Sequence, residues 1–337
     1  MSKLRLSVLD QAPIAEGESG ADALRHSLDL AQLCDRLGYH RYWVAEHHGT
    51  PMLACASPEA LIGPIAATTQ SIRVGSGGVM LPHYSPLKVA ETFSMFAGLY
   101  PDRIDLGLGR APGSDPKTAY ALQRDRRQAV PDDFPDQLVE LLAYLEDTLP
   151  ADHPFRDLSK LPGLPHAPEP WLLGSSPQSA IWAGQLGLPY VFADFINPAG
   201  AAIAERYREA FTPSERLAKP RISVAVWALA AETDAEAERL SSSHRMAMRL
   251  FLMGKWIAVP PVETALKFLA DAPPRPTGLG GRQRRRISGS PAAVREKIEA
   301  VAEEYGAEEV MIVTITYEHA ARRRSYELIA KAFDLPD

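Results

Sequence analysis

The feature that most constrains this chain is a regular alternation of short apolar segments with longer segments whose apolar residues recur every three or four positions. A short apolar run is typical of a buried strand, and the three-to-four spacing is typical of one helix face. Strand patterns occupy residues 4–9, 41–45, 72–79, 103–108, 171–173, 190–195, 221–230 and 310–316, and the main helical patterns occupy residues 24–37, 58–70, 86–99, 137–147, 178–186, 199–211, 291–306 and 322–333. The chain therefore predicts eight β-then-α units in order.

Eight such units favour a closed (β/α)8 barrel, the TIM barrel, over an open doubly wound sheet, because strands joined by helical crossovers run parallel. An open dinucleotide-binding sheet usually has a glycine-rich turn after its first strand, whereas this chain continues there as Asp10-Gln11-Ala12-Pro13. A plain barrel needs about 250 residues. The surplus in this chain of 337 residues falls after strand four, at 111–135, and after strand seven, at 231–289. We expect one barrel domain over residues 1–337 with these two insertions.

Charge and composition exclude several classes of protein. A net charge of −6 gives no electrostatic reason to expect nucleic acid or an anionic membrane as a partner. No apolar run approaches the roughly 18 residues of a membrane span, and charged residues interrupt the apolar stretch at the N-terminus. Cys34 and Cys55 lack C-x-x-C spacing, as is typical of free thiols in a reducing compartment. We therefore expect a cytoplasmic protein.

The segment Glu46-His47-His48 follows the second predicted strand. Active sites of (β/α)8 barrels lie at the C-terminal ends of the strands, so these side chains are candidates for catalysis. Neighbouring residues on extended backbone point to opposite sides, which predicts different roles for the two histidines. One can act as a general acid or base near neutral pH. A metal site that also uses Asp10 and Asp194, and plain structural histidines, are open alternatives at this point.

Glycines interrupt the third predicted strand, most notably Gly77-Gly78. Glycine inside a strand weakens it and usually marks a bulge or a close approach of the backbone to a ligand. The pattern therefore predicts either a bulge that helps to close the barrel or room for a flat ring.

A phosphate site is predicted between strands four and five. Arg110 stands in a glycine-rich turn after strand four, and arginine suits bidentate binding of phosphate. Ser175, Ser176 and Ser179 open the helix after strand five, where hydroxyls and free N–H groups can bind an anion. The same serines also suit an ordinary helix cap. A basic tract at 280–286 is interpreted as a solvated loop or, within 273–289, as a mobile lid that meets a cofactor phosphate or an anionic substrate.

These motifs in this order resemble the bacterial luciferase-like monooxygenase family. The resemblance rests on residues 11–13, 45–48, 74–82, 86–91 and 102–110, covers nearly the whole chain, and is weakest in the two insertions. It implies a (β/α)8 barrel that binds reduced FMN or a related flavin. It also implies that O₂ adds to the reduced flavin to give a C4a-peroxyflavin, which oxygenates a small organic substrate. Reduced FMN would come from a separate NAD(P)H:flavin reductase.

The resemblance also implies roles for individual residues. His47 matches the family histidine that acts as acid or base near the flavin, and Glu46 matches the acidic residue beside it. Gly77-Gly78 matches a pair joined by a non-proline cis peptide under the isoalloxazine ring.

By the same resemblance, Arg110 matches the phosphate-binding arginine, and Ser176 and Ser179 match its hydroxyl partners. Ser175 stands where the luciferase itself has an acidic residue, and Gly109 stands where it has a reactive cysteine. These departures argue against light emission, and the stretch from Gly109 onward is more similar to an uncharacterised bacterial branch of the family.

Other functions are compatible with the same pattern. Related barrels transfer hydride to or from a deazaflavin coenzyme, and a barrel can also bind flavin without turnover. A metal-dependent lyase or hydrolase built on Glu46, His47 and His48 is a further alternative, although we predict no metal. Dimers are common in the resembled family, so a homodimer is one expectation. The sequence names no substrate, and we expect specificity to lie in the two insertions.

Overall fold

The computed structural model describes residues 4–110, 115–123, 125–127, 133–197, 200–272, 285 and 287–336. The strands are β1 (Arg5–Asp10), β2 (Arg41–Val44), β3 (Arg73–Met80), β4 (Ile104–Gly109), β5 (Glu169–Gly174), β6 (Tyr190–Ala193), β7 (Ile222–Ala230), β8 (Ile287–Gly289) and β9 (Glu309–Val313). The helices are α1 (Gly20–Arg36), α2 (Pro58–Thr68), α3 (Pro86–Leu99), α4 (Pro116–Leu122), α5 (Phe134–Glu146), α6 (Pro177–Gln185), α7 (Ala201–Ala210), α8 (Asp234–Leu252), α9 (Val262–Asp271), α10 (Pro291–Tyr305) and α11 (His319–Ala332), with a 3-10 turn at Leu81–His83. Most of the predicted loop at 273–289 lies outside the described residues.

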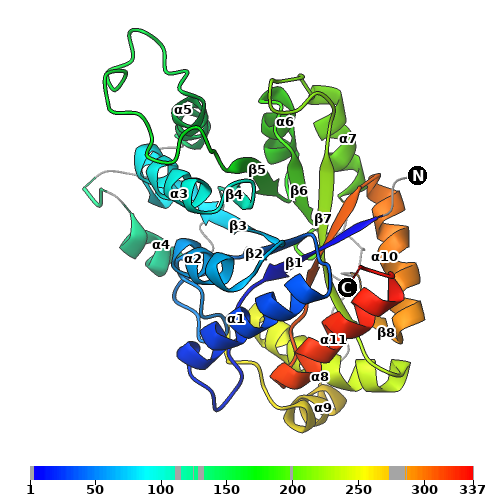
Figure 1. Ribbon diagram of the computed structural model, residues 1–337. Coiled ribbons are helices and arrows are strands. Elements are labelled where there is room, and N and C mark those ends of the chain that lie inside the picture. The colour runs from blue at the N-terminus through cyan, green and yellow to red at the C-terminus, as the bar shows by residue number, and fades with distance from the viewer. Residues whose placement is uncertain are drawn as a thin grey trace.

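Eight parallel strands form a closed barrel, and helices surround it (Figure 1). The ring runs β1-β2-β3-β4-β5-β6-β7-β9 and closes where β9 pairs with β1. The predicted (β/α)8 barrel is therefore confirmed. The short strand β8 was not predicted, and it lies outside the ring, where it pairs with the last three residues of β7. Three residues are too few to give a recognisable strand pattern.

Local signals explain where the helices begin and end. Ser19 caps α1 in a capping box with Asp22, and Gly38 follows that helix with a φ of 73°, a left-handed conformation that favours glycine after a helix. Proline stands in the first turn of α3 and α10, where its missing N–H costs no hydrogen bond. The helix α4 was missed, because it is short and lies in the polar insertion at 111–135.

The core has two main layers. Inside the barrel, Trp43 and Trp171 pack edge to face with ring centroids 5.4 Å apart. Outside it, apolar side chains of the strands pack against the surrounding helices. Cys34 and Cys55 are buried and unpaired, as predicted.

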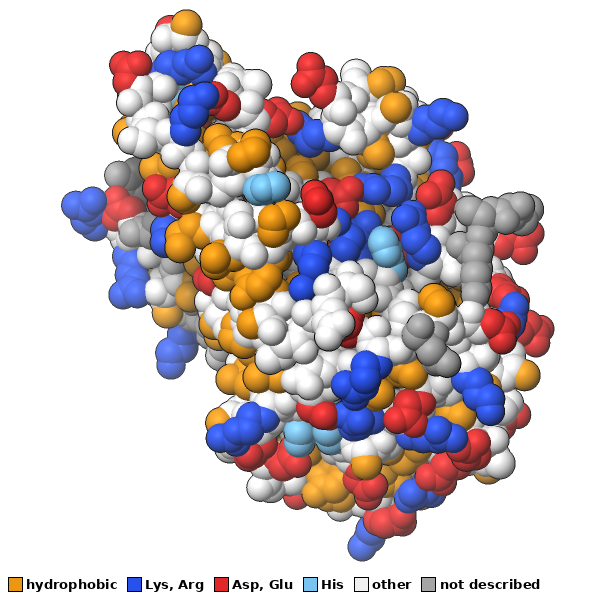
Figure 2. Space-filling view, in the orientation of Figure 1, with side chains coloured by type: hydrophobic (Ala, Val, Ile, Leu, Met, Phe, Trp, Pro, Cys, Tyr) orange, Lys and Arg blue, Asp and Glu red, His pale blue; other side chains and the backbone are white. Residues whose placement is uncertain are grey.

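The insertion at 231–289 provides α8, α9 and β8, and the two helices lie together at the lower edge of Figure 1. A small apolar cluster that includes Leu229, Leu240 and Val262 joins these helices to the end of β7. Its placement puts the insertion beside the C-terminal ends of the strands. None of the described helices is both long and apolar enough to cross a membrane. On the face shown in Figure 2, basic and acidic side chains are interspersed.

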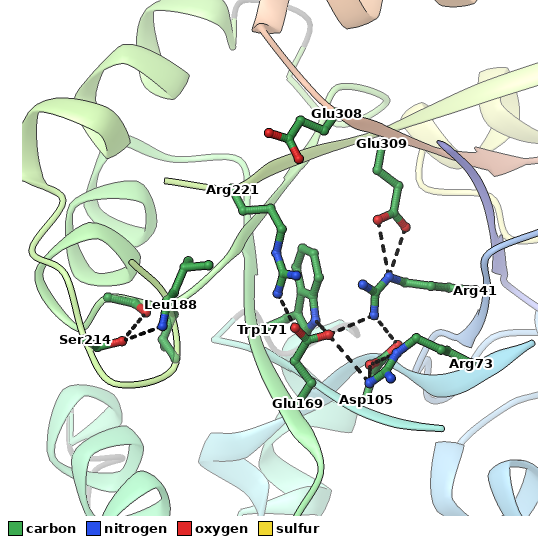
Figure 3. A network of polar contacts seen from close by, with 12 residues as sticks. Arg41, Arg73, Asp105, Glu169, Trp171, Leu188, Ser214, Arg221, Glu308 and Glu309 are labelled. Carbon is green, nitrogen blue, oxygen red and sulfur yellow. Dashed lines mark hydrogen bonds and ion pairs between the residues drawn. The ribbon is translucent and has the colours of Figure 1, made fainter. Parts of the chain in front are cut away.

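A polar network fills the N-terminal end of the barrel (Figure 3). Arg41, the first residue of β2, donates from Nη1 to Asp105 at 2.8 Å and to Glu169 at 3.0 Å, and from Nε to Glu309 at 3.1 Å. Arg73 donates from Nη2 to the other oxygen of Asp105 at 2.6 Å. These side chains come from the first residues of β2, β3, β5 and β9 and from the second residue of β4, so they meet only when the parallel strands close into a ring.

The charges in this network stabilise one another. Burial alone would lower the pKa of Arg41. The carboxylates of Asp105, Glu309 and Glu169 outweigh this effect, so the pKa of Arg41 is raised overall. Burial works to raise the pKa of Glu169, but the charges of Arg41 and Arg221 outweigh it and lower that pKa to about 2. Arg41 and Glu169 are therefore both charged at neutral pH.

Candidate functional site

Glu46 is a fully buried carboxylate just beyond the C-terminal end of β2. Its Oε1 lies 2.7 Å from His48 Nε2 and accepts from the Tyr84 hydroxyl at 2.8 Å, while its Oε2 accepts from the Met80 N–H at 2.9 Å. Burial, followed by the Glu46 charge, raises the pKa of Tyr84, which keeps that hydroxyl protonated as a donor. Glu46 therefore joins the ends of β2 and β3 and holds His48 in place.

His47 has a different environment from His48, as the alternation of extended backbone predicted. Its backbone N–H donates to the Cys55 carbonyl at 2.9 Å. Its ring is partly exposed, yet Nδ1 is buried and has no hydrogen-bond partner among the described residues. Burial, with a smaller contribution from His48, lowers the pKa of His47 to about 4. The imidazole is therefore neutral at pH 7 and can accept a proton.

The peptide bond between Gly77 and Gly78 is cis, as the family resemblance implied. The pairing of β3 with β4 shifts register between Ser76 and Val79, so the bulge predicted from the glycines is also present. A Cβ added to Gly78 would lie 2.8 Å from the Gly107 carbonyl oxygen, so packing of β3 against β4 already requires glycine there. Contact with a flavin ring stays a prediction for this pair.

Arg110 lies beside the helix that follows β5. It is exposed, and its guanidinium carbon stands 5.5 Å from the centre of the Trp182 ring on α6. Because β4 pairs with β5, the turn after β4 lies next to the start of α6. The structure therefore places Arg110 against α6, and contact of Arg110 and the N-terminus of this helix with one phosphate stays a prediction.

The three serines before and within α6 differ in accessibility. Ser176 caps the helix, and its Oγ accepts from the Ser179 N–H at 3.3 Å. Ser179 is buried, donates to the Ser176 carbonyl at 2.9 Å and lies 3.0 Å from the Tyr190 hydroxyl. The Ser175 carbonyl accepts from Asn197 at 3.0 Å. Ser179 thus shapes the first turn of α6, while Ser175 and Ser176 are partly exposed beside it.

The metal alternative loses its further ligands in this structure. Asp10 accepts from Arg322 at 2.5 Å, and Asp194 accepts from Arg285 at 2.9 Å. Within the described residues, no group of three or more His, Cys, Asp and Glu side chains is arranged to hold a metal ion. The carboxylates at these strand ends act as partners of arginine.

Sequence reasoning missed two aromatic residues of this region, Tyr84 on Glu46 and Trp182 under Arg110. The only signal for Tyr84 is the aromatic pair His83-Tyr84 directly after β3. Trp182 lies on a helix face, where an aromatic residue more often belongs to the core.

Comparisons with known proteins identify the family of this chain. The model of the family described as "Luciferase-like monooxygenase" matches residues 4–309. A luciferase-like monooxygenase of Escherichia coli K12 is 41% identical over 96% of both chains. An N-acetyl-S-alkylcysteine monooxygenase of Bacillus subtilis is 37% identical over 98% of both.

Solved structures with the same fold were also found. Apo-MsnO8 superposes with a TM-score of 0.90 at 43% identity, over 99% of this chain and 98% of that one. The oxygenating constituent of 3,6-diketocamphane monooxygenase in complex with FMN (TM-score 0.71, 21% identity, 97% of both chains) and an F420-dependent secondary alcohol dehydrogenase (0.67, 16%, 99% of this chain and 100% of that one) share the fold alone. With the family model matching most of its length, the chain belongs to the luciferase-like monooxygenase family.

Proposed function

We propose that this protein is a flavin-dependent monooxygenase that uses reduced FMN and O₂ to oxygenate a small organic substrate. A separate NAD(P)H:flavin reductase would deliver the reduced FMN. The observation that carries the proposal is the joint placement of Arg110 and the N-terminus of α6 at the same barrel mouth as the neutral His47. The relative that acts on N-acetyl-S-alkylcysteine makes organosulfur compounds the first substrates to test.

The residues present fit the phosphate of FMN. The first N–H groups of a helix lack partners inside the helix and attract anions. Arg110 lies against Trp182 of the same helix and adds a positive charge that would contact the phosphate. Ser176 stands at the cap position, where its hydroxyl can contact the same anion.

When bound, reduced FMN supplies the electrons that activate O₂. The protein supplies proton transfer and positioning. A histidine with a pKa of about 4 is neutral at pH 7, and the unpartnered Nδ1 of His47 is the atom that we expect to receive a proton during the reaction. Glu46 fixes His48 and Tyr84 next to it through two hydrogen bonds and so keeps the surrounding wall rigid.

The test of this function combines cofactor and oxygen. Anaerobic enzyme with reduced FMN is mixed with O₂ and N-acetyl-S-alkylcysteines in stopped flow, and the oxygenated product is measured by mass spectrometry. We expect product in the wild type and at least a tenfold slower reaction in His47→Ala. The matched control is His166→Ala, which removes an exposed histidine between α5 and β5. This variant should react like the wild type.

Two results would contradict the proposal. One is much tighter binding of the deazaflavin coenzyme than of FMN, which would favour hydride transfer on the same fold. The other is an unchanged rate in His47→Ala, which would remove the proton-transfer role and favour a protein that binds flavin without using this histidine.

A further inference from the structure

A pocket lies at the ends of β7 and β9, against α8. Its wall is lined by residues from these elements and from β8, namely Trp227, Ala228, Leu229, Ser241, His244, Arg245, Met248, Leu252, Arg285, Ile287, Ser288, Val313 and Ile315. Most of this wall is apolar, with an aromatic ring, a methionine and several branched side chains. The candidate flavin site does not use it.

The pocket belongs to the barrel mouth. Val313 and Ile315 are members of the apolar cluster inside the barrel, together with Ala45 next to the candidate catalytic segment. Trp227 packs against the same cluster. The predicted phosphate site lies across the ring, at the ends of β4 and β5. The arc at β7 and β9 therefore lies on the other side of the barrel mouth from the predicted phosphate site.

The polar part of the lining has one sign of charge. Arg245 and Arg285 line the pocket, and no carboxylate does so among the described residues. Glu238 contacts Nη1 of Arg245, while Asp194 and Glu304 contact Nε and Nη2 of Arg285 at 2.9 and 2.6 Å. These acids hold the arginines from outside the lining.

Arginine retains donors in this arrangement. A guanidinium presents five N–H donors, and the ion pairs with Glu238, Asp194 and Glu304 use only some of the nitrogens of Arg245 and Arg285. Both side chains are 27% exposed, so they remain accessible from the pocket. A planar, permanently charged fork beside an apolar wall is suited to a carboxylate that carries an apolar group.

We propose that this pocket binds the substrate, and that the substrate is a small carboxylate with an apolar remainder. Arg245 and Arg285 hold the carboxylate, and Trp227, Met248 and Leu252 enclose the apolar group. The inference rests on the proposed function, because it assigns the molecule that is oxygenated. It places the determinant of specificity in α8 and in Arg285, two residues before β8, both within the insertion at 231–289.

The test measures binding without flavin, so its result does not depend on the proposed reaction. N-acetyl-S-butylcysteine and its primary amide, which differ only in the charged group, are titrated into the flavin-free protein by calorimetry. We expect the carboxylate to bind at least tenfold more tightly than the amide. Arg245→Met should lose that preference, and Arg245→Lys should restore part of it, since lysine keeps the charge without the planar fork.

Arg239→Met is the matched control. Arg239 lies on the same helix and also pairs with glutamates, but it does not line the pocket. We expect it to bind both probes like the wild type, and circular dichroism confirms that each variant is folded. Arg285→Met gives an independent second variant with the same expected loss.

Equal affinity for the carboxylate and the amide overturns the inference, as does unchanged binding in both Arg245→Met and Arg285→Met. Absence of saturable binding of the carboxylate also overturns it. A carboxylate preference that disappears in the variants, in a protein that yields no oxygenated product, would retain the pocket assignment and reject the proposed reaction.

Discussion

The two ends of the barrel differ in whether their charged groups have partners within the protein. At the N-terminal end, the single guanidinium of Arg41 contacts three carboxylates, and every member of that network has a partner within the protein (Figure 3). At the C-terminal end, Arg110 is exposed over an aromatic ring, and a buried nitrogen of His47 lacks a partner within the described residues. The charged groups of the N-terminal network thus have partners within the protein, whereas Arg110 and His47 Nδ1 at the C-terminal end are available to a ligand.

From this difference we infer that the N-terminal end of the barrel contributes to stability and that the C-terminal end binds ligands. A buried charge is stable only when it is paired and hydrogen-bonded. The network at the N-terminal end meets that condition by itself, so a ligand would add little there. At the other end, the exposed guanidinium of Arg110 and the Nδ1 atom of His47 are available to another molecule, in line with the general division of labour in (β/α)8 barrels.

The largest expected effect comes from a substitution in the polar network at the N-terminal end of the barrel. Asp105→Asn leaves Arg41 and Arg73 without their shared buried carboxylate, and it should lower the free energy of unfolding by about 3–5 kcal/mol. Urea denaturation measures this. Glu263→Gln, which removes an exposed partner of Arg239, is the control and should cost about 0–1 kcal/mol. Similar losses in the two variants would show that the network does not depend on burial.

Acid should reduce the stability that the same network contributes to the protein. Because the pKa of Glu169 falls from 4.5 to about 2 on folding, its stabilisation is complete above pH ~4.5 and is lost as the pH falls toward 2. At about 1.4 kcal/mol per pKa unit, the loss amounts to roughly 3 kcal/mol. Glu169→Gln should flatten the stability profile between these pH values in denaturant titrations. A profile as steep as that of the wild type would assign acid unfolding to other carboxylates.

The C-terminal end of the barrel should respond in binding rather than in stability. Arg110→Ala should weaken FMN binding by about 1.5–3 kcal/mol, the usual contribution of a charged hydrogen bond, while riboflavin, which lacks the phosphate, should bind as before. Fluorescence titration of both flavins gives the comparison. Arg127→Ala, a highly exposed arginine paired with Asp125, is the matched control. An equal loss for FMN and riboflavin would place Arg110 away from the phosphate.

The smallest expected effect concerns the bulged strand between the two ends. Gly78→Ala brings a Cβ to within 2.8 Å of the Gly107 carbonyl and should destabilise the protein by about 1–3 kcal/mol. Gly109→Ala is the control, because its Cβ would meet nothing closer than Met80 Sδ at 3.6 Å. Thermal unfolding compares the two variants. Equal stability would mean that β3 and β4 can separate without cost.

Much of the site could be predicted, but its internal pairing could not. The positions of Glu46, His47 and Arg110 follow from where apolar runs end, since catalytic residues of a barrel lie just after its strands. That Glu46 binds His48 rather than His47 depends on the path of the chain after β2 and on Tyr84 arriving from beyond β3. The cis bond at Gly77-Gly78 followed only from the family resemblance, because two adjacent glycines do not by themselves specify it.

The sequence by itself determined the units of this protein, since helix and strand periodicities, prolines in first turns and glycines after helices are local signals that each segment carries alone. Only the tertiary structure decided which charges meet. Arg41, Asp105, Glu169 and Glu309 are far apart along the chain and come together because parallel strands of one ring place their first residues at the same end. It likewise decided that Arg245 and Arg285, forty residues apart in the insertion at 231–289, line one pocket. The physical reason is that closure of the barrel, rather than local preference, sets the distances between strands.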